Sequence, residues 1–223
     1  MKTAQEIYTE YNILPTLQLH QLRVAAVGKM LCEHSEETLN IHDVITACLF
    51  HDMGNIIKSD LSAFPEFLEP KGLAYWQSIK DEYVRKYGTD HHEANTSIAK
   101  EIGFPEGAYK LLAGIGFSKL EEILKTGSSE QQICEYSDLR VGPHGVLSMR
   151  DRLDEGRKRY ARRNPNELGG TISMGSNEEL YQARVHFAEE LERKIFSKVN
   201  MTPDDITDSA IENTIEELRK YSV

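Results

Sequence analysis

Helical periodicity constrains the fold of this chain more than any other feature of the sequence. Apolar residues recur three or four positions apart in one segment after another, and no segment shows the sustained alternation of apolar and polar residues that a half-buried strand requires. The chain is therefore predicted to be all-α. We predict helices over residues 3–12, 15–32, 41–57, 72–87, 90–103, 106–114, 118–125, 129–140, 177–198 and 203–221.

The character of the sequence changes after the pair Gly142-Pro143, where turn-forming residues interrupt the helical pattern. We expect residues 1–145 to form a helical core. Residues 146–223 are expected to form a helical C-terminal extension, which packs on the core or lies at the interface of a homodimer. Within the core, DLSAFPEFLEP at residues 60–70 contains two prolines and is predicted to be a loop.

Two segments of the extension have an unusual composition. Seven lysine or arginine residues lie within residues 150–163, and the glycine-rich stretch LGGTISMGS spans residues 168–176. We interpret the basic segment as a solvated helix face that balances neighbouring acids, with contact to a phosphate-rich ligand as the alternative. The glycine-rich stretch is interpreted as a linker, with a lid over a binding site as the alternative.

The charge of the chain argues against general nucleic-acid binding and against binding to anionic membrane surfaces. The formal net charge is −10, whereas such binding depends on an excess of lysine and arginine. No window approaches the roughly 18 apolar residues of a membrane span, and the N-terminus lacks the apolar core of a signal peptide, so we expect a cytoplasmic protein. The isolated cysteines Cys32, Cys48 and Cys134 are interpreted as small core residues.

The stretch LFHDMGNIIKS, residues 49–59, places His51 and Asp52 directly after an apolar run that suits the middle of a helical bundle. A divalent metal explains polar residues there, because imidazole nitrogen and carboxylate oxygen lose little by leaving water when they bind a cation. Two adjacent residues cannot complete the coordination of a metal. Further ligands must come from neighbouring helices, and the candidates are His20, beside an apolar stripe, and Asp138 in CEYSDLRVG.

The order of these residues, with a glycine and an asparagine shortly after the His-Asp pair, resembles the H…HD…D pattern of the HD superfamily of metal-dependent phosphohydrolases. The resemblance covers roughly residues 15–145. It implies an antiparallel helical core and one divalent ion, of which Mn, Fe, Co, Ni, Zn and Mg are the candidates. The metal ligands that it implies are His20, His51, Asp52 and Asp138.

Each of these assignments has a plainer alternative. His51 and Asp52 could form a buried hydrogen-bonded pair without a metal, and His20 could be a packed residue at the edge of a helix. A second dipeptide, His42-Asp43, could be mistaken for the motif. We interpret it as the start of a helix, where Asp43 complements the positive helix end and His42 is solvated.

Members of the superfamily with two metals usually add two histidines between the His-Asp pair and the final aspartate. His92 corresponds to the first of them, but LLAGIGFSKL, where the second is expected, contains no histidine. We therefore predict one metal and expect His92 to contact the substrate or the metal-bound water. His91, which points elsewhere on its helix, is assigned to the start of that helix.

The resemblance implies hydrolysis of a phosphate ester by a metal-activated water, with Asp52 as a possible proton acceptor. The negative transition state needs positive groups, and Arg23, Lys58 and Arg140 are the candidates for phosphate contact. Asn55 is expected to bind substrate or to orient the aspartate. The expected substrate is a nucleotide or another small phosphomonoester. The alternatives are a dinuclear enzyme, either a nucleoside polyphosphate hydrolase or an iron-dependent oxygenase, and a non-catalytic nucleotide-binding sensor.

Overall fold

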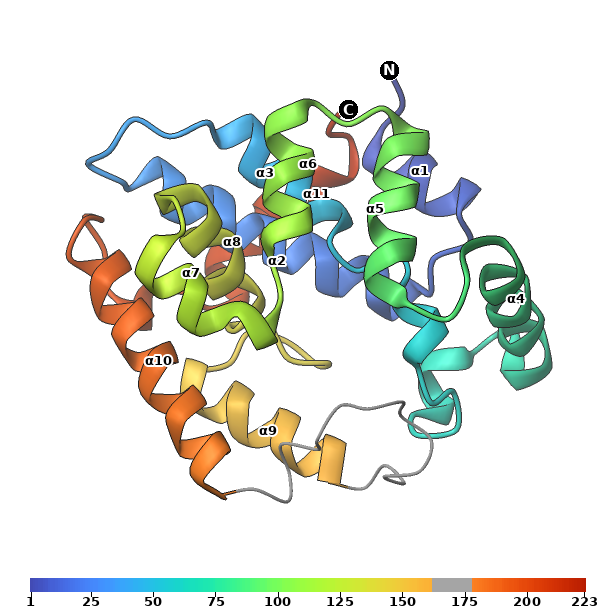
Figure 1. Cartoon of the computed structure of the whole chain (residues 1–223). Helices are drawn as coiled ribbons and strands as arrows, with labels where there is room; N and C mark the ends of the chain where they lie inside the picture. Colours follow the sequence, from blue (N-terminus) through green and yellow to red (C-terminus); the bar gives the residue numbers. More distant parts are fainter. Residues whose placement is uncertain (162–177) are drawn as a thin grey trace.

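The computed structural model describes residues 1–161 and 178–223, and in these ranges the fold is all-α, as predicted (Figure 1). The glycine-rich stretch at 168–176 lies outside the described residues. The α-helices are α1 Ala4–Glu10, α2 Pro15–Glu33, α3 Ile41–Phe50, α4 Gly72–Tyr87, α5 His91–Ile102, α6 Glu106–Gly114, α7 Leu120–Thr126, α8 Ser129–Asp138, α9 Met149–Ala161, α10 Glu178–Phe196 and α11 Asp208–Arg219. Short 3₁₀ helices are η1 Asn55–Lys58, η2 Pro65–Leu68, η3 Phe117–Lys119 and η4 Pro203–Asp205.

Local capping explains why several helix ends agree with the sequence pattern. The side chain of Asn40 accepts the backbone N–H of Asp43 at 3.2 Å and begins α3. Asp90 begins α5 in the same way by accepting the N–H groups of two residues in the first turn. Gly103 ends α5 with a φ of 86°, a left-handed conformation that glycine adopts without steric cost.

The third helix is shorter than predicted. It ends at Phe50 and not near residue 57, so His51 and Asp52 lie in a turn that leads into η1. The carbonyl of His51 accepts the side-chain amide of Asn95 at 2.5 Å, and the N–H of Gly54 donates to the same side chain at 2.5 Å. Helix α5 thus satisfies backbone groups that a longer α3 would have paired internally.

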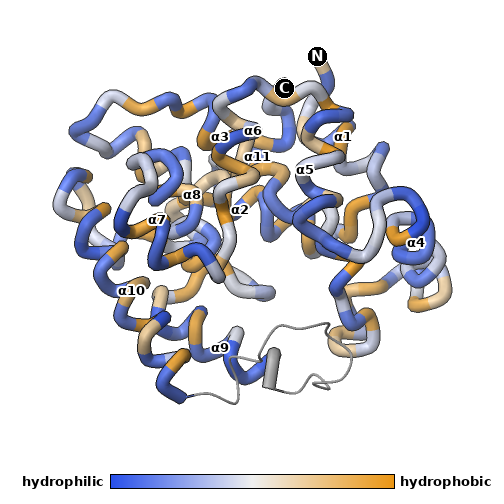
Figure 2. Tube along the Cα trace, viewed as in Figure 1, coloured by the Kyte–Doolittle hydropathy of each residue, from blue (hydrophilic) through white to orange (hydrophobic). Residues whose placement is uncertain are grey.

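Helix α3 forms the centre of the bundle and packs against α2, α6 and α8. Every residue from Asp43 to Phe50 is buried, as expected for a helix that is apolar all round. Gly28 on α2 permits the close contact, since a Cβ there would lie 3.3 Å from Cys48 Sγ. Figure 2 shows hydrophobic stretches where α2, α3 and α8 meet, and alternating colours along outer helices such as α10.

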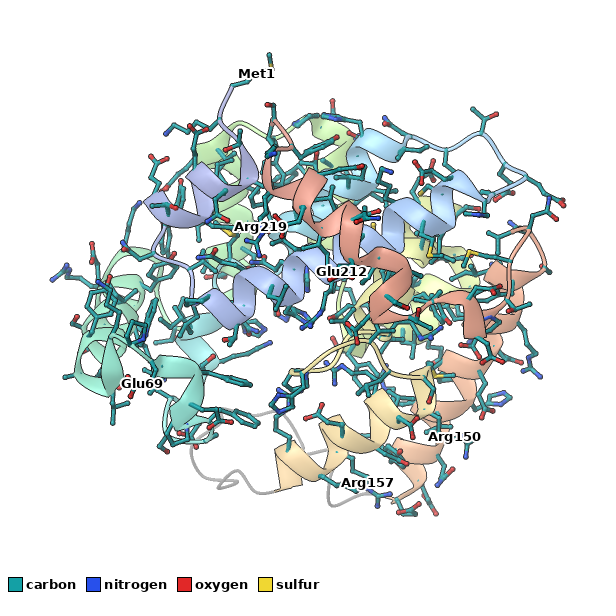
Figure 3. The ribbon with its side chains drawn as sticks, turned by 180° about the vertical axis from the view of Figure 1, so that it is seen from behind. Met1, Glu69, Arg150, Arg157, Glu212 and Arg219 are labelled. Atoms are coloured by element: carbon teal, nitrogen blue, oxygen red, sulfur yellow. The ribbon has the colours of Figure 1, made fainter. Side chains whose placement is uncertain are left out.

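The C-terminal helices pack on the rest of the bundle. Helix α11, marked by Glu212 and Arg219 in Figure 3, lies along α2, while α10 packs against α7 and α8. Leu191 and Ile211 belong to the same apolar cluster as Leu22. None of the described helices is both long enough and apolar enough to cross a membrane.

The arginines of α9 pair with acids. Arg150 pairs with Glu189 and Arg157 with Glu178, both from α10, and Arg159 pairs with Glu155 within the helix. This is the arrangement expected of a helix face that balances neighbouring acids.

Candidate metal centre

Residues from three separate elements meet at the candidate metal centre. His20 lies on α2, His51 and Asp52 lie in the turn after α3, and Asp138 is the last residue of α8. The ligand atoms of His20, His51 and Asp52 all lie within 4.8 Å of one another. Asp138 Oδ1 lies 3.1 Å from His20 Nε2 and 3.6 Å from His51 Nε2. The fold therefore brings together the four ligands that the sequence predicted.

The polar atoms of this cluster fit a divalent cation. His51 Nε2 and Asp138 Oδ1 are shielded from solvent, and among the described residues their polar neighbours are members of the cluster itself, not hydrogen-bond partners outside it. Buried polar atoms that make no well-aligned hydrogen bond are costly, and bonds to a cation would satisfy both. Two imidazole nitrogens and two carboxylates suit Mn, Fe, Co, Ni or Zn.

Hydrogen bonds orient the ligand atoms toward one another. His51 Nδ1 lies 2.8 Å from the carbonyl of Cys48, which fixes the proton on Nδ1 and leaves Nε2 free to bind a metal. Asn55 donates to Asp52 Oδ2 at 2.7 Å, and the backbone N–H of Asp52 donates to Gln21 at 3.1 Å. This hydrogen bond places Asn55 where it can orient Asp52, one of the two roles predicted for it.

The charges in the cluster stabilise one another. Burial raises the pKa of Asp138, but His20 and His51 outweigh this effect and hold that pKa well below its usual value. Burial lowers the pKa of His51, whereas Asp52 and Asp138 raise it to about 10. The carboxylates of Asp52 and Asp138 are therefore ionised. A metal cation bound beside them would have to displace the proton of the His51 imidazole.

Asn95 and Gly54 hold the ligand-bearing turn against α5. The Asn95 amide bonds the turn at both His51 and Gly54, and a Cβ on Gly54 would lie 2.6 Å from Ala94 Cβ. Only glycine allows this approach of turn and helix. Asn95 was not predicted as a functional residue. Its position beside the apolar residues of α5 could have indicated a buried hydrogen-bonding side chain.

Lys58 and the pair His91-His92 lie beside the ligands. The two imidazole rings have centroids 3.9 Å apart. Burial and the nearby ammonium of Lys58 lower the pKa of His91 to about 4 and also lower that of His92. Lys58 has no hydrogen bond or ion pair among the described residues, and its charge lowers the pKa of Asp52. These three side chains therefore form a partly positive region next to Asp52.

The stretch that lacks a second histidine lies next to His92. A Cβ on Gly116 would be 3.8 Å from His92 Cε1. The N–H of Gly116 donates to the carboxylate of Glu135 at 2.8 Å, and this buried acid lies one helical turn before Asp138. Burial raises the pKa of Glu135 to about 7. Glu135 was not predicted, although its spacing from Asp138 places both on one face of α8.

Arg140 was predicted to contact phosphate, but its side chain is buried among other parts of the protein. It is buried and donates to Tyr136 and to the backbone carbonyls of Leu147, Pro203 and Ile206. Its guanidinium therefore joins α8 to the C-terminal segment, and the predicted phosphate contact is replaced by a structural role. Sequence spacing from Asp138 could not reveal this, because the partners lie far along the chain.

Arg23 and His42 each have a partner from the C-terminal region. Arg23 Nε lies 3.2 Å from Asp208 Oδ1, at the start of α11, and remains a candidate for phosphate contact. His42 is exposed, and its Nδ1 contacts the hydroxyl of Tyr221. The second His-Asp dipeptide is therefore apart from the metal centre, at the start of α3, as predicted.

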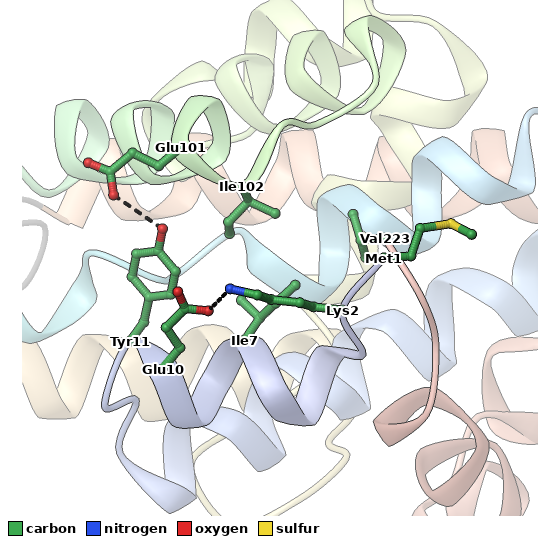
Figure 4. A pocket seen from close by; sticks show the side chains of 8 residues that line it. All are labelled: Met1, Lys2, Ile7, Glu10, Tyr11, Glu101, Ile102 and Val223. Carbon is green, nitrogen blue, oxygen red and sulfur yellow. Dashed lines mark hydrogen bonds and ion pairs between the residues drawn. The ribbon is translucent and has the colours of Figure 1, made fainter.

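A cavity of about 240 Å³ lies away from this centre, between the two ends of the chain (Figure 4). Lys2 and Glu10 form an ion pair across it, and Tyr11 donates to Glu101. It shares no residue with the metal centre.

Replacing Asn95 by alanine should destabilise the fold and weaken metal binding. The change leaves the His51 carbonyl and the Gly54 N–H buried without partners, so we expect unfolding to become easier by about 2 to 4 kcal/mol. Chemical denaturation of metal-free protein measures this loss, with Ser97→Ala on the exposed side of α5 as the control. A loss no greater than that of the control would contradict the proposed clamp.

Replacing Lys58 by methionine should raise the pKa of His91 and of His92, because a neighbouring ammonium disfavours a second positive charge. Burial remains, so both values should stay below the ordinary value. Proton NMR titration measures them, and Lys110→Met, on the exposed surface of α6, should change neither. Unchanged pKa values in Lys58→Met would show that this ammonium is not beside the two rings.

Comparison with known proteins agrees with the geometry. A family model described as the HD domain matches residues 18–126, a span that includes His20, His51 and Asp52 and ends before Asp138. Neither the comparison with curated proteins nor that with solved structures gave a match. Residues 18–126 thus match the HD domain, and this match supports the resemblance to the HD superfamily of metal-dependent phosphohydrolases.

Proposed function

We propose that this protein hydrolyses a nucleotide or another small phosphomonoester with the help of one divalent ion. The observation that supports this most is the convergence of two imidazoles and two carboxylates, in which His51 Nε2 and Asp138 Oδ1 are shielded from solvent and face each other at 3.6 Å. The match of residues 18–126 to the HD domain supports the general reaction class. The choice of a small substrate rests on the net charge of −10, which disfavours a long polyanion.

The residues around the centre have complementary roles in this reaction. His20, His51, Asp52 and Asp138 would hold the ion, which when bound supplies Lewis-acid activation of water and of the phosphoryl group. Asp52 is ionised and oriented by Asn55, so it can accept a proton from the attacking water. Lys58 offers its ammonium to the phosphate, and His92, uncharged at neutral pH, can donate or accept a hydrogen bond.

The charge next to the centre favours one ion over two. A second cation held by His91 or His92 would lie close to the ammonium of Lys58, which already lowers the pKa of both imidazoles by repulsion. The neighbouring stretch from Leu111 to Leu120 contains no further histidine. We therefore propose a mononuclear centre, for which elemental analysis should give about one metal per chain.

The test combines metal loading with a panel of substrates. Full-length protein loaded with Mn, Co, Ni or Mg should release phosphate from at least one nucleotide or sugar phosphate. Asp52→Ala should lower kcat/KM by about 100-fold or more, because one residue both binds the ion and receives the proton. Asp81→Ala, an exposed acid on α4, is the matched control and should leave the rate unchanged.

Two results would contradict the proposal. Metal-loaded, folded protein that hydrolyses no member of the panel would favour a nucleotide-binding sensor. Equal activity in Asp52→Ala and wild type would show that the reaction does not use this centre.

A further inference from the structure

Three aromatic side chains from two distant segments meet outside the core, and we call them the aromatic cluster: Phe64, Phe67 and His144. The Phe64 and Phe67 rings are stacked, with centroids 4.9 Å apart and an interplanar angle of 15°. The His144 ring meets both of them edge-on, 5.4 Å from Phe67 and 6.4 Å from Phe64. Phe64 and Phe67 lie around η2, and His144 lies in the loop between α8 and α9.

Core packing does not explain these rings. Phe64 and Phe67 are only half-buried, and among the described residues neither belongs to the apolar core or to the partly buried side chains packed against it. Their neighbours Leu61 and Leu68 do belong to that core and anchor the segment at both ends. The segment is thus fixed to the bundle while its two phenylalanine rings are held outside it.

The loop that carries His144 is connected by a hydrogen bond and an ion pair to α2, near the metal centre. His144 follows Asp138 by six residues, and two residues later the N–H of Val146 donates to Asp208 Oδ2 at 3.1 Å. The other carboxylate oxygen of Asp208 lies 3.2 Å from Arg23 Nε, and Arg23 is one helical turn from His20. The loop bearing His144 is therefore fixed close to two of the ligand-bearing helices.

The segment that carries Phe64 and Phe67 follows Asp52 in the chain. Asn55 bonds Asp52, η1 ends at Lys58, and the carbonyl of Ser59 accepts Lys80 Nζ at 2.7 Å. Phe64 follows Lys58 by six residues. Figure 3 shows side chains of the segment before Glu69 pointing toward the loop that precedes α9. The rings thus meet between the two segments that leave the metal ligands.

We propose that the aromatic cluster binds the nucleobase of a nucleotide whose phosphate lies at the metal centre. This inference rests on the proposed function and narrows its substrate class. Half-buried aromatic rings outside the core favour a flat π system, and stacking on aromatic side chains binds all bases with little preference. Lys58, between the ligands and the phenylalanines in sequence, would meet the phosphate.

The surface around the aromatic cluster is too small for a protein or lipid partner. Among the described residues, the large apolar side chains that are exposed are Met1 and Leu73, and neither belongs to the cluster. Specific protein interfaces bury about 800 Å² on each partner, far more than three rings provide. A single flat ligand group fits this patch better.

The test compares substrates with and without a base. Phe64→Leu and Phe67→Leu keep the apolar volume but remove the ring, and Phe187→Leu, a half-buried phenylalanine on α10, is the matched control. We expect each cluster variant to raise KM for nucleoside monophosphates about tenfold and to leave KM for ribose 5-phosphate unchanged. His144 is exposed, and His144→Ala should also raise KM for nucleoside monophosphates.

Equilibrium binding of adenosine, guanosine, cytidine and uridine to the full chain gives a readout without turnover. At least one nucleoside should bind about tenfold more weakly to Phe67→Leu than to wild type or to Phe187→Leu. No nucleoside binding, or equal losses for ribose 5-phosphate and nucleotides, would overturn the inference while leaving a phosphohydrolase in place. Nucleoside binding that depends on Phe67, in a protein that releases no phosphate, would support the inference and refute the proposed function.

Discussion

The attraction between two carboxylates and two imidazoles at one point of the bundle is the interaction on which the other features of this structure depend. Asp52, in the turn after α3, and Asp138, at the end of α8, approach the same pair of histidines, and their charge raises the pKa of His51 to about 10. Such a concentration of charge away from water is stable only when a positive partner is present. A proton on His51 provides part of this positive charge. A divalent ion bound by all four residues would provide more of it.

The bundle provides the rigidity that this centre needs. The apolar α3 fixes the position from which the chain turns at His51, and the Asn95 amide holds that turn against α5. Arg140 fixes the end of α8, where Asp138 lies, to the C-terminal segment. The segments that carry the candidate ligands are thus held by the packing of α3 and by the hydrogen bonds of Asn95 and Arg140, as a preorganised metal site requires.

Much of this arrangement could be predicted from the sequence, because it depends on local chemistry. Asp90 and Gly103 mark the ends of α5 in the sequence. The resemblance to the HD pattern named His20, His51, Asp52 and Asp138 as candidate ligands, and the fold brings these four residues together. The end of α3 could not be predicted, because Asn95 interrupts it from another helix. The role of Arg140 and the meeting of Phe67 with His144 depend equally on contacts between distant residues, which periodicity does not record.

The central claim concerns the ligands themselves, and X-ray absorption spectroscopy of the cobalt-loaded full chain tests it most directly. The account predicts about one ion per chain, bound by two imidazoles together with oxygen ligands, and loss of one imidazole signal in His20→Ala. A spectrum without imidazole scattering, or one that His20→Ala leaves unchanged, would contradict it.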